Sequence, residues 1–365
     1  MTGGGGGDLL GLTAELVAIP SPSRHEQALA DRVQELLSAA PWLEVSRVGD
    51  NVVARTDLGR ARRLLVAGHL DTVPPAGNGV PRVDGDTLWG VGACDMKGGL
   101  AVMIDLARTL RAPEVDVTWC FYACEEIARS ENGLVRLWEE RPDLLAADAA
   151  VLGEPTDARV EAGCQGTLRA VVHLGGKRAH TARPSTGCNA IHRLAPVLDR
   201  VAGWKGRTVV LDGCVFVEQL QAVAVEGGVA ANVVPDHAAL TLNHRFAPDR
   251  DAASARAHLV RLFDGLLDQA WGDLVEVVDG ADGAAPSLGH PLLAAVLAAT
   301  GDAARAKLGW TDVATMSAHG VPATNFGPGD PLLAHGPDEH VTRASLERAR
   351  AVLASVLSGD RVASR

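Results

Sequence analysis

The sequence lacks the features that would place this protein in a membrane or in an oxidising compartment. No apolar run among its 365 residues approaches the roughly 18 residues that are needed to span a bilayer. The opening Met1 to Gly7 has no basic start and no apolar core, so we do not expect a signal peptide. The six cysteines form no CxxC pair, which favours reduced thiols and a cytoplasmic location.

Positive charge is also scarce. Lysine and arginine number 34 against 45 acidic residues, which leaves a net charge of −11. This balance argues against nucleic acid or an anionic membrane as a partner, although a local positive pocket could still hold an acidic substrate. A hydrophobic content of 47% is ordinary for a globular protein. Because 365 residues exceed what one core usually serves, we expect two domains.

The most informative stretch is Gly68-His69-Leu70-Asp71-Thr72-Val73, which follows the apolar run Leu64 to Ala67. The run predicts a buried strand of a parallel sheet. Ligands of such sheets collect at the carboxyl ends of the strands, so His69 is a candidate metal ligand. Asp71 is placed to orient its imidazole. By themselves these six residues fit a structural histidine beside a turn aspartate better than a metal site.

Acidic residues follow three further strand or loop segments. Asp95 lies in the glycine-rich stretch Gly90 to Gly99, before a predicted helix from about Leu100 to Leu110. That stretch fits neither phosphate-binding fingerprint; it is equally typical of close backbone approach to a ligand and of a flexible loop. Glu125 and Glu126 follow the apolar strand Val115 to Ala123, and Glu154 follows the strand Ala147 to Leu152. An acidic pair such as Glu125-Glu126 also occurs at solvated helix starts.

These side chains together predict a metal centre. Strands alternate with helices, so the sheet should be largely parallel and its strand ends should converge. Nitrogen and oxygen donors without cysteine suit Zn²⁺, with Mn²⁺ or Co²⁺ also able to bind. Four carboxylates and one histidine exceed the needs of a single tetrahedral ion and suit a two-metal site with a bridging aspartate. The segment Ala334-His335-Gly336 offers the second histidine.

With these segments in view, the chain resembles the M20 metallopeptidase/amidohydrolase family from about residue 10 to 355. The resemblance rests on GHLDTV, GACDMKGG, CEE, GEPT, Ala179-His180 and Ala334-His335-Gly336. It implies an α/β fold: a mostly parallel sheet with helices on both faces, formed by residues 1–167 and 279–365. An inserted α+β lid and dimerisation domain would cover residues 168–278.

The resemblance also implies roles for the site residues and a cis peptide at Asp95-Met96. Two Zn²⁺ ions per subunit would be held by His69 and Glu154 on one side and by Glu126 and His335 on the other, with Asp95 as the bridge. Asp71 would orient His69, and Glu125 would be the general base.

Residues of the predicted lid receive their roles only from the resemblance. His180 would stabilise an oxyanion, and Asn232 and Arg245 would bind a substrate carboxylate. From the residues alone they read as an exposed loop histidine, a turn asparagine before Pro235 and a surface arginine, although the planar guanidinium of Arg245 suits a carboxylate.

Within the family, the chain resembles the actinobacterial branch that hydrolyses N-succinyl-LL-2,6-diaminopimelate. The supporting stretches are residues 161–169, 307–313, which includes the candidate substrate-binding Thr311, and 325–330. One departure is Gln165, where members from other bacteria tend to have a basic residue. The expected partners are therefore a small N-acyl amino acid and a second copy of the chain. Alternatives are an acetylornithine deacetylase, a small carboxypeptidase or a non-catalytic metal-binding protein.

Overall fold

The apolar run before His69 forms β3 (Arg63–His69), which lies near the centre of an eight-stranded sheet. β3 pairs in parallel with β6 (Asp116–Tyr122) and with β7 (Ala149–Leu152). All seven residues of β6 are buried, as an apolar strand between two neighbours requires. Residues 7–359 are described by this computed structural model.

The sheet is parallel in its centre and antiparallel at its edges. Its order is β1-β2-β6-β3-β7-β16-β8-β15. The remaining strands are β1 (Glu44–Val48), β2 (Asn51–Arg55), β8 (Glu161–Ala162), β15 (Arg305–Ala306) and β16 (Ala323–Asn325). β16 continues the parallel set beside β7, whereas β1 and β2 form an antiparallel hairpin around Gly49 and Asp50. The predicted α/β class with a mostly parallel central sheet is confirmed.

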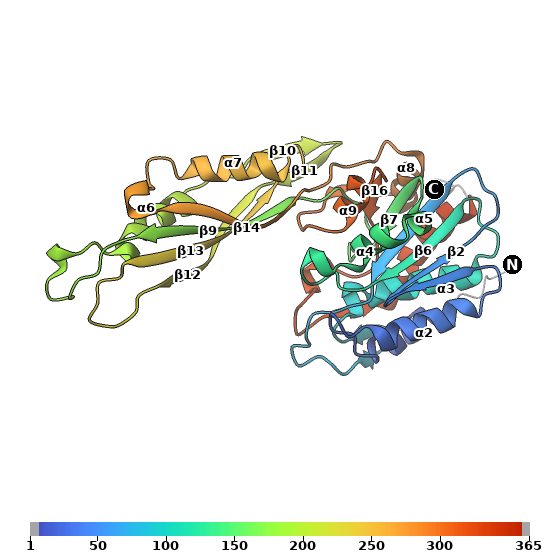
Figure 1. Cartoon of the computed structure of the whole chain (residues 1–365). Coiled ribbons are helices and arrows are strands. Elements are labelled where there is room, and N and C mark those ends of the chain that lie inside the picture. The colour runs from blue at the N-terminus through green and yellow to red at the C-terminus, as the bar shows by residue number, and fades with distance from the viewer. Residues whose placement is uncertain (1–6, 360–365) are drawn as a thin grey trace. The chain divides into compact units, whose positions relative to one another are not determined.

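Helices pack on both faces of this sheet, as Figure 1 shows for α2 and α3 on one side and α4 and α5 on the other. The helices of this part of the chain are α1 (Leu9–Val17), α2 (Gln27–Ser38), α3 (Gly98–Thr109), α4 (Gly133–Glu140), α5 (Pro142–Leu145), α8 (Pro291–Thr300), α9 (Val313–Ala318) and α10 (Arg343–Ser358). Single turns are η1 (Ala93–Lys97), η2 (Arg129–Glu131) and η5 (Pro331–Leu333). A small sheet of order β17-β5-β4 joins β17 (His340–Thr342) to β5 (Thr87–Trp89) and β4 (Arg82–Asp84).

Close packing explains part of the glycine-rich stretch before α3. A Cβ atom on Gly99 would lie 2.4 Å from the main-chain oxygen of Gly153. Gly153 follows β7 and precedes Glu154. Glycine therefore lets the start of α3 approach the end of β7 more closely than any other residue would.

The chain divides into two units: unit 1 contains residues 1–163, 286–305 and 311–365, and unit 2 contains residues 164–285 and 306–310. The predicted insertion, residues 168–278, lies inside unit 2. Unit 2 has a four-stranded antiparallel sheet of order β12-β13-β9-β14. Its strands are β9 (Gly166–Gly175), β12 (Gln219–Gly227), β13 (His237–Phe246) and β14 (Leu274–Ala281), and β10 (Thr208–Leu211) pairs with β11 (Cys214–Val217). Its helices and turns are α6 (Ala190–Ala202), α7 (Ala252–Leu262), η3 (Pro184–Thr186) and η4 (Gln269–Trp271).

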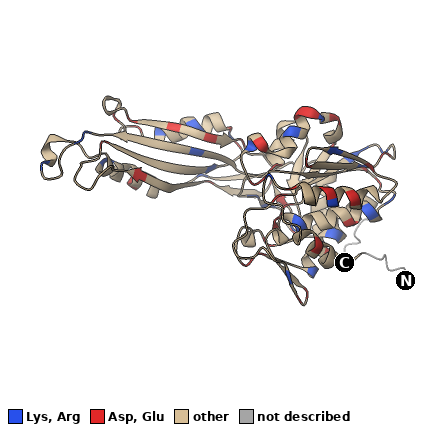
Figure 2. Ribbon diagram, turned by 60° about the horizontal axis from the view of Figure 1, so that its bottom comes forward, with Lys and Arg blue, Asp and Glu red and all other residues tan. Residues whose placement is uncertain are grey.

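One face of the unit 2 sheet is covered and the other is open. Leu194 and Val197 of α6 and Leu259 of α7 pack against Val172 and Leu240 in the sheet. Residues of β9 alternate between buried and more exposed positions, as a sheet with one covered face requires. Acidic and basic side chains are interspersed over the helices of both units (Figure 2). None of the helices in the described part of the chain has the length and apolar character that a membrane crossing needs.

Candidate active site

His69 is the last residue of β3, and its side chain is 1% exposed. Its Nε2 lies 3.1 Å from Asp95 Oδ1, and its Nδ1 lies 3.0 Å from the main-chain oxygen of Asp71. The Asp71 carboxylate is 3.5 Å from the same Nδ1. The imidazole is thus held at Nδ1 while Nε2 points toward Asp95, the arrangement in which a histidine presents one nitrogen to a metal.

Asp95 lies between two histidines that are far apart in the chain. Its Oδ1 faces His69, and its Oδ2 lies 3.4 Å from Nε2 of His335. The same Nε2 is 2.9 Å from Oε1 of Glu126. The two oxygens of Asp95 are therefore each directed at a different candidate ligand, which is the geometry that a bridging carboxylate needs. The Asp95-Met96 peptide is cis.

The side chains around Asp95 fit divalent cations. His69, Asp95 and Glu126 can each offer a ligand atom within 4.8 Å of the others. The carboxylates of Asp95 and Glu126 raise the pKa of His335 to about 10, which reports a strongly negative local potential. Such a potential attracts cations, and the mixed nitrogen and oxygen donors suit Zn²⁺, Mn²⁺ or Co²⁺.

Glu125 and Glu154 lie beside this cluster. Glu154 is 6% exposed and follows β7, the parallel neighbour of β3. Desolvation raises the pKa of Glu125 well above its usual range; His69 opposes the rise, and the negative charges of Glu154 and Asp312 add to it. A raised pKa favours the protonated form of Glu125 and makes this carboxyl group a candidate general base or acid.

Asp71 does more than the sequence predicted. Its Oδ1 accepts the main-chain N–H of Glu125 and its Oδ2 that of Glu126, both at 3.0 Å. The hydroxyl of Ser23 donates to Oδ2 at 2.8 Å. Cys124, directly before these acids, has a φ of 59°, so the chain turns sharply there. The fully buried Asp71 carboxylate therefore holds the turn that presents Glu125 and Glu126.

The stretch Ser23-Arg24-His25-Glu26 has the residue spacing that predicts a capping box at the start of a helix, and this prediction is wrong. α2 begins at Gln27, and Ser23 binds Asp71 instead of a helix N–H. Glu26, which is 1% exposed, accepts the main-chain N–H of Cys124. Neither side chain caps α2, because each forms a hydrogen bond with a residue far away in the chain.

The residues predicted in the lid lie in unit 2. His180 is exposed, and its Nδ1 accepts the N–H of Ala182 at 3.0 Å, so Nε2 carries the ring proton and can donate. Its main chain forms a bridge with Val233, next to the exposed Asn232. Arg245 is half-buried on β13, and its Nε donates to Asn243 Oδ1 at 3.2 Å.

Two further positions have interior partners. In unit 1, the buried hydroxyl of Thr311 donates to Asn325 Oδ1 at 2.9 Å. In unit 2, Gln165 is 1% exposed and donates to the main-chain oxygen of Val217 at 2.9 Å. Gln165 thus ties the start of β9 to the end of β11.

Ser23, Glu26 and Glu339 are residues near the site that the sequence did not reveal. Glu339 is 1% exposed and accepts the main-chain N–H groups of Cys94 and Asp95. Its place on the same loop as His335 is the one signal that could have marked it. A hydrogen bond to a distant main chain leaves no pattern in sequence.

Residues 65–359 match the family described as Peptidase family M20/M25/M40. The chain is 51% identical over 354 residues to the putative succinyl-diaminopimelate desuccinylase DapE of Mycobacterium tuberculosis H37Rv, covering 97% of this chain and 99% of that protein. It is 45% identical over 358 residues to the succinyl-diaminopimelate desuccinylase of Corynebacterium glutamicum, covering 96% of each.

Solved structures share the fold at low identity. Aminopeptidase PepT from Bacillus cereus matches with a TM-score of 0.78 and 18% identity, covering 96% of this chain and 97% of that one. The YXEP protein of Bacillus subtilis, described as a dinuclear metal binding peptidase from the M20 family, matches with a TM-score of 0.69 and 17% identity, covering 96% of each chain.

The bracing role of Asp71 leads to a stability prediction. Asp71→Asn should lower the free energy of unfolding by about 1–3 kcal/mol, because the amide NH₂ of asparagine leaves one of the two buried N–H groups without an acceptor. Ser23→Ala removes a single hydrogen bond to the same carboxylate and should cost only about 1 kcal/mol. Urea denaturation of both variants measures the difference. Equal losses would contradict the bracing role.

Proposed function

The chain belongs to peptidase family M20/M25/M40, and from this membership we propose that it hydrolyses N-succinyl-LL-2,6-diaminopimelate to succinate and LL-2,6-diaminopimelate. This reaction belongs to diaminopimelate and lysine biosynthesis. The observation that carries the chemistry is the Asp95 carboxylate, whose two oxygens face His69 and His335. The proposed substrate rests on the two desuccinylases that are 51% and 45% identical to this chain.

The proposed metal ligands are those that the family resemblance implies, and the contacts of Asp95 with His69 and His335 and of Glu126 with His335 support them. His69 and Glu154 would hold one ion, Glu126 and His335 the other, and Asp95 would contact both. We propose two Zn²⁺ ions per subunit, with Co²⁺ or Mn²⁺ as substitutes. When bound, the ions supply a water of lowered pKa and polarise the amide carbonyl.

Glu125 is the proposed proton carrier. Its carboxylate takes the proton of the attacking water and returns it to the nitrogen of the leaving amine. The hydrogen bonds from the N–H groups of Glu125 and Glu126 to Asp71 hold the turn in place during both transfers. Because the Asp71 carboxylate accepts the main-chain N–H groups of both acids, it fixes their positions relative to each other while they serve different roles.

Residues of unit 2 would supply the substrate contacts. The Nε2–H of His180 is free to donate because Nδ1 already accepts from Ala182, so we assign it to the oxyanion. Arg245 and Asn232 would bind a substrate carboxylate. In the described part of the chain no ion pair includes Arg245, which leaves its guanidinium for such a group. We propose that Thr311 contacts the substrate through its main chain, because its hydroxyl already donates a hydrogen bond to Asn325.

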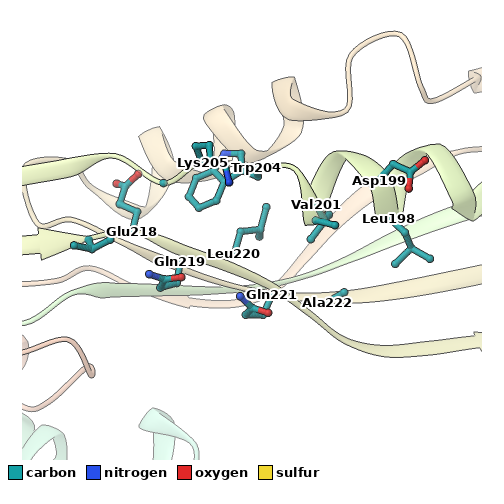
Figure 3. Close-up of a pocket in the computed structure, with 13 residues that line it drawn as sticks. Leu198, Asp199, Val201, Trp204, Lys205, Glu218, Gln219, Leu220, Gln221 and Ala222 are labelled. Carbon is teal, nitrogen blue, oxygen red and sulfur yellow. The ribbon is translucent and has the colours of Figure 1, made fainter.

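We also propose that unit 2 forms a homodimer through β12. This nine-residue strand is the edge of its sheet, and Val223 and Val225 are more than half exposed. Glu226 is the one charged residue of β12, so this edge has little of the charge that protects sheet edges from pairing. Beside the edge, a cavity of about 560 Å³ lies between α6 and β12, lined by Leu198, Trp204 and Leu220 among others (Figure 3). A second copy would continue the sheet and cover this cavity.

A cytoplasmic location is proposed from the cysteines. The six cysteines form no disulfide with one another in the described part of the chain, and four of them are buried. Free cysteines are usual in a reducing compartment.

The first experiment tests the function itself. Metal-free protein should be inactive, and Zn²⁺ should restore hydrolysis of N-succinyl-LL-2,6-diaminopimelate, because the proposed ions lower the pKa of the attacking water and polarise the carbonyl. The kcat/KM for N-succinyl-LL-2,6-diaminopimelate should exceed the values for N-acetylornithine and for a dipeptide. Arg245→Ala should lower the kcat/KM for N-succinyl-LL-2,6-diaminopimelate. Activity that survives in protein shown by elemental analysis to be metal-free would overturn the metal mechanism. Preference for acetylornithine or the dipeptide would favour those alternatives.

The second experiment separates the adjacent acids. Glu125→Gln should keep two metal ions and lose a factor on the order of 10² or more in kcat, because it removes the proton acceptor. Glu126→Gln should lower metal content, because it weakens a ligand. Elemental analysis and steady-state kinetics on both variants make the comparison. Identical behaviour of the two would refute the division of roles.

The third experiment asks whether His180 serves the partner subunit, as the family resemblance implies. A mixed dimer of a His180→Ala chain and a Glu125→Ala chain then contains one complete site and one that lacks both groups. We expect about half of the wild-type activity per dimer, as for two independent sites related by a twofold axis.

The mixed dimer is purified with two tags and assayed beside both parent dimers. If His180 acts within its own subunit, each site lacks one group and activity stays at the level of the parents. A monomer in sedimentation analysis would instead exclude the proposed pairing of β12.

A further inference from the structure

Glu339 links the two segments that carry Asp95 and His335. Its carboxylate oxygen Oε1 accepts the main-chain N–H groups of Cys94 and Asp95, both at 3.0 Å. Its main-chain oxygen accepts the N–H of Gly90 at 3.0 Å, and its N–H donates to the oxygen of Gly336 at 3.3 Å. One residue therefore contacts the loop of His335 through its backbone and the turn of Asp95 through its side chain.

The turn that carries Asp95 needs an outside acceptor. In η1, Asp95 has φ −119° and ψ 96°, and Met96 has φ −133° and ψ 36°, values that are not helical. The N–H groups at the start of a short helical turn have no acceptor within the turn. Oε1 of Glu339 supplies one acceptor to two consecutive N–H groups, so it fixes the main chain from which the Asp95 side chain leaves.

Glu339 is also a buried carboxyl group, which interacts electrostatically with Lys97 but forms no ion pair with it. It is 1% exposed, and within residues 7–359 no ion pair includes it. Lys97, the cation of the same turn, donates its Nζ to the main-chain oxygen of Ile19 at 2.8 Å. Burying a carboxylate without a paired cation is costly. A cation bound at Asp95, whose main-chain N–H donates to Glu339, would offset that cost.

We propose that Glu339 is a positioning residue for Asp95, which it orients so that the two carboxylate oxygens face His69 and His335. The inference rests on the proposed function, in which Asp95 contacts both ions. It differs from the role of a ligand, because the loss of Glu339 should weaken both ions together. Loss of Glu126, by contrast, should affect mainly one.

The test measures cobalt binding and not only activity. In Glu339→Ala, both Co²⁺ ions should bind about 10–100-fold more weakly, the usual effect of removing a residue that orients a ligand, and the visible absorption of the Co²⁺-loaded protein should change. Glu339→Gln keeps an acceptor oxygen and should lie between wild type and Glu339→Ala. Competition with a chelator gives the affinities.

Asp116 provides a matched control. This aspartate is also buried, and it accepts the N–H groups of Leu58 and Arg60 at 2.8 Å each. It stands at the first residue of β6, whereas Glu125 follows the other end of that strand. Asp116→Ala should therefore reduce stability while leaving cobalt affinity and absorption as in wild type.

The outcomes separate this inference from the proposed function. Cobalt affinity and absorption in Glu339→Ala that match those of Asp116→Ala would overturn the positioning role while leaving the function intact. If Glu339→Ala does not fold, Glu339→Gln carries the test, and wild-type affinity and absorption in that variant would overturn the role. A wild-type protein that bound no divalent cation would overturn the proposed function and the inference together.

Discussion

Carboxylates crowd the carboxyl ends of the central parallel strands, and their mutual repulsion is the constraint on which this site depends. Asp71, Glu125 and Glu154 follow β3, β6 and β7, three adjacent strands. Parallel pairing brings these ends to one edge of the sheet. Like charges this close are unfavourable unless hydrogen bonds and cations compensate them. Asp95 and Glu126 raise the pKa of His335, and burial together with the charges of Glu154 and Asp312 raises that of Glu125. Bound divalent cations are the compensation we propose.

Within the protein itself, main-chain N–H groups compensate part of the negative charge of these carboxylates. Asp71 accepts two of them from the turn of Glu125, and Glu339 accepts two from the turn of Asp95. In both cases a buried carboxylate that is not a proposed ligand shapes the turn that presents one. The site therefore depends on the backbone conformation of two short turns as much as on the identity of its ligands.

The residues to which we assign catalytic and substrate-binding roles are divided between the two units. Unit 1 holds the proposed ligands and Glu125, and unit 2 holds His180, Asn232 and Arg245. The unpaired β12 edge and the cavity beside it lie in unit 2 as well. The proposed association through that edge would thus act on the unit that carries the proposed substrate contacts.

The sequence by itself determined the parallel sheet, because apolar runs such as Leu64 to Ala67 have one favourable environment, the buried strand. It also placed His69, Glu125 and Glu154 after such strands, so their convergence followed from topology alone. Only the tertiary structure decided that Ser23 binds Asp71, that Glu26 binds the turn at Cys124 and that Glu339 holds the turn at Asp95. Each of these contacts joins a side chain to a partner far away in the chain, and hydrogen bonds of that kind impose no periodicity on the residues between them.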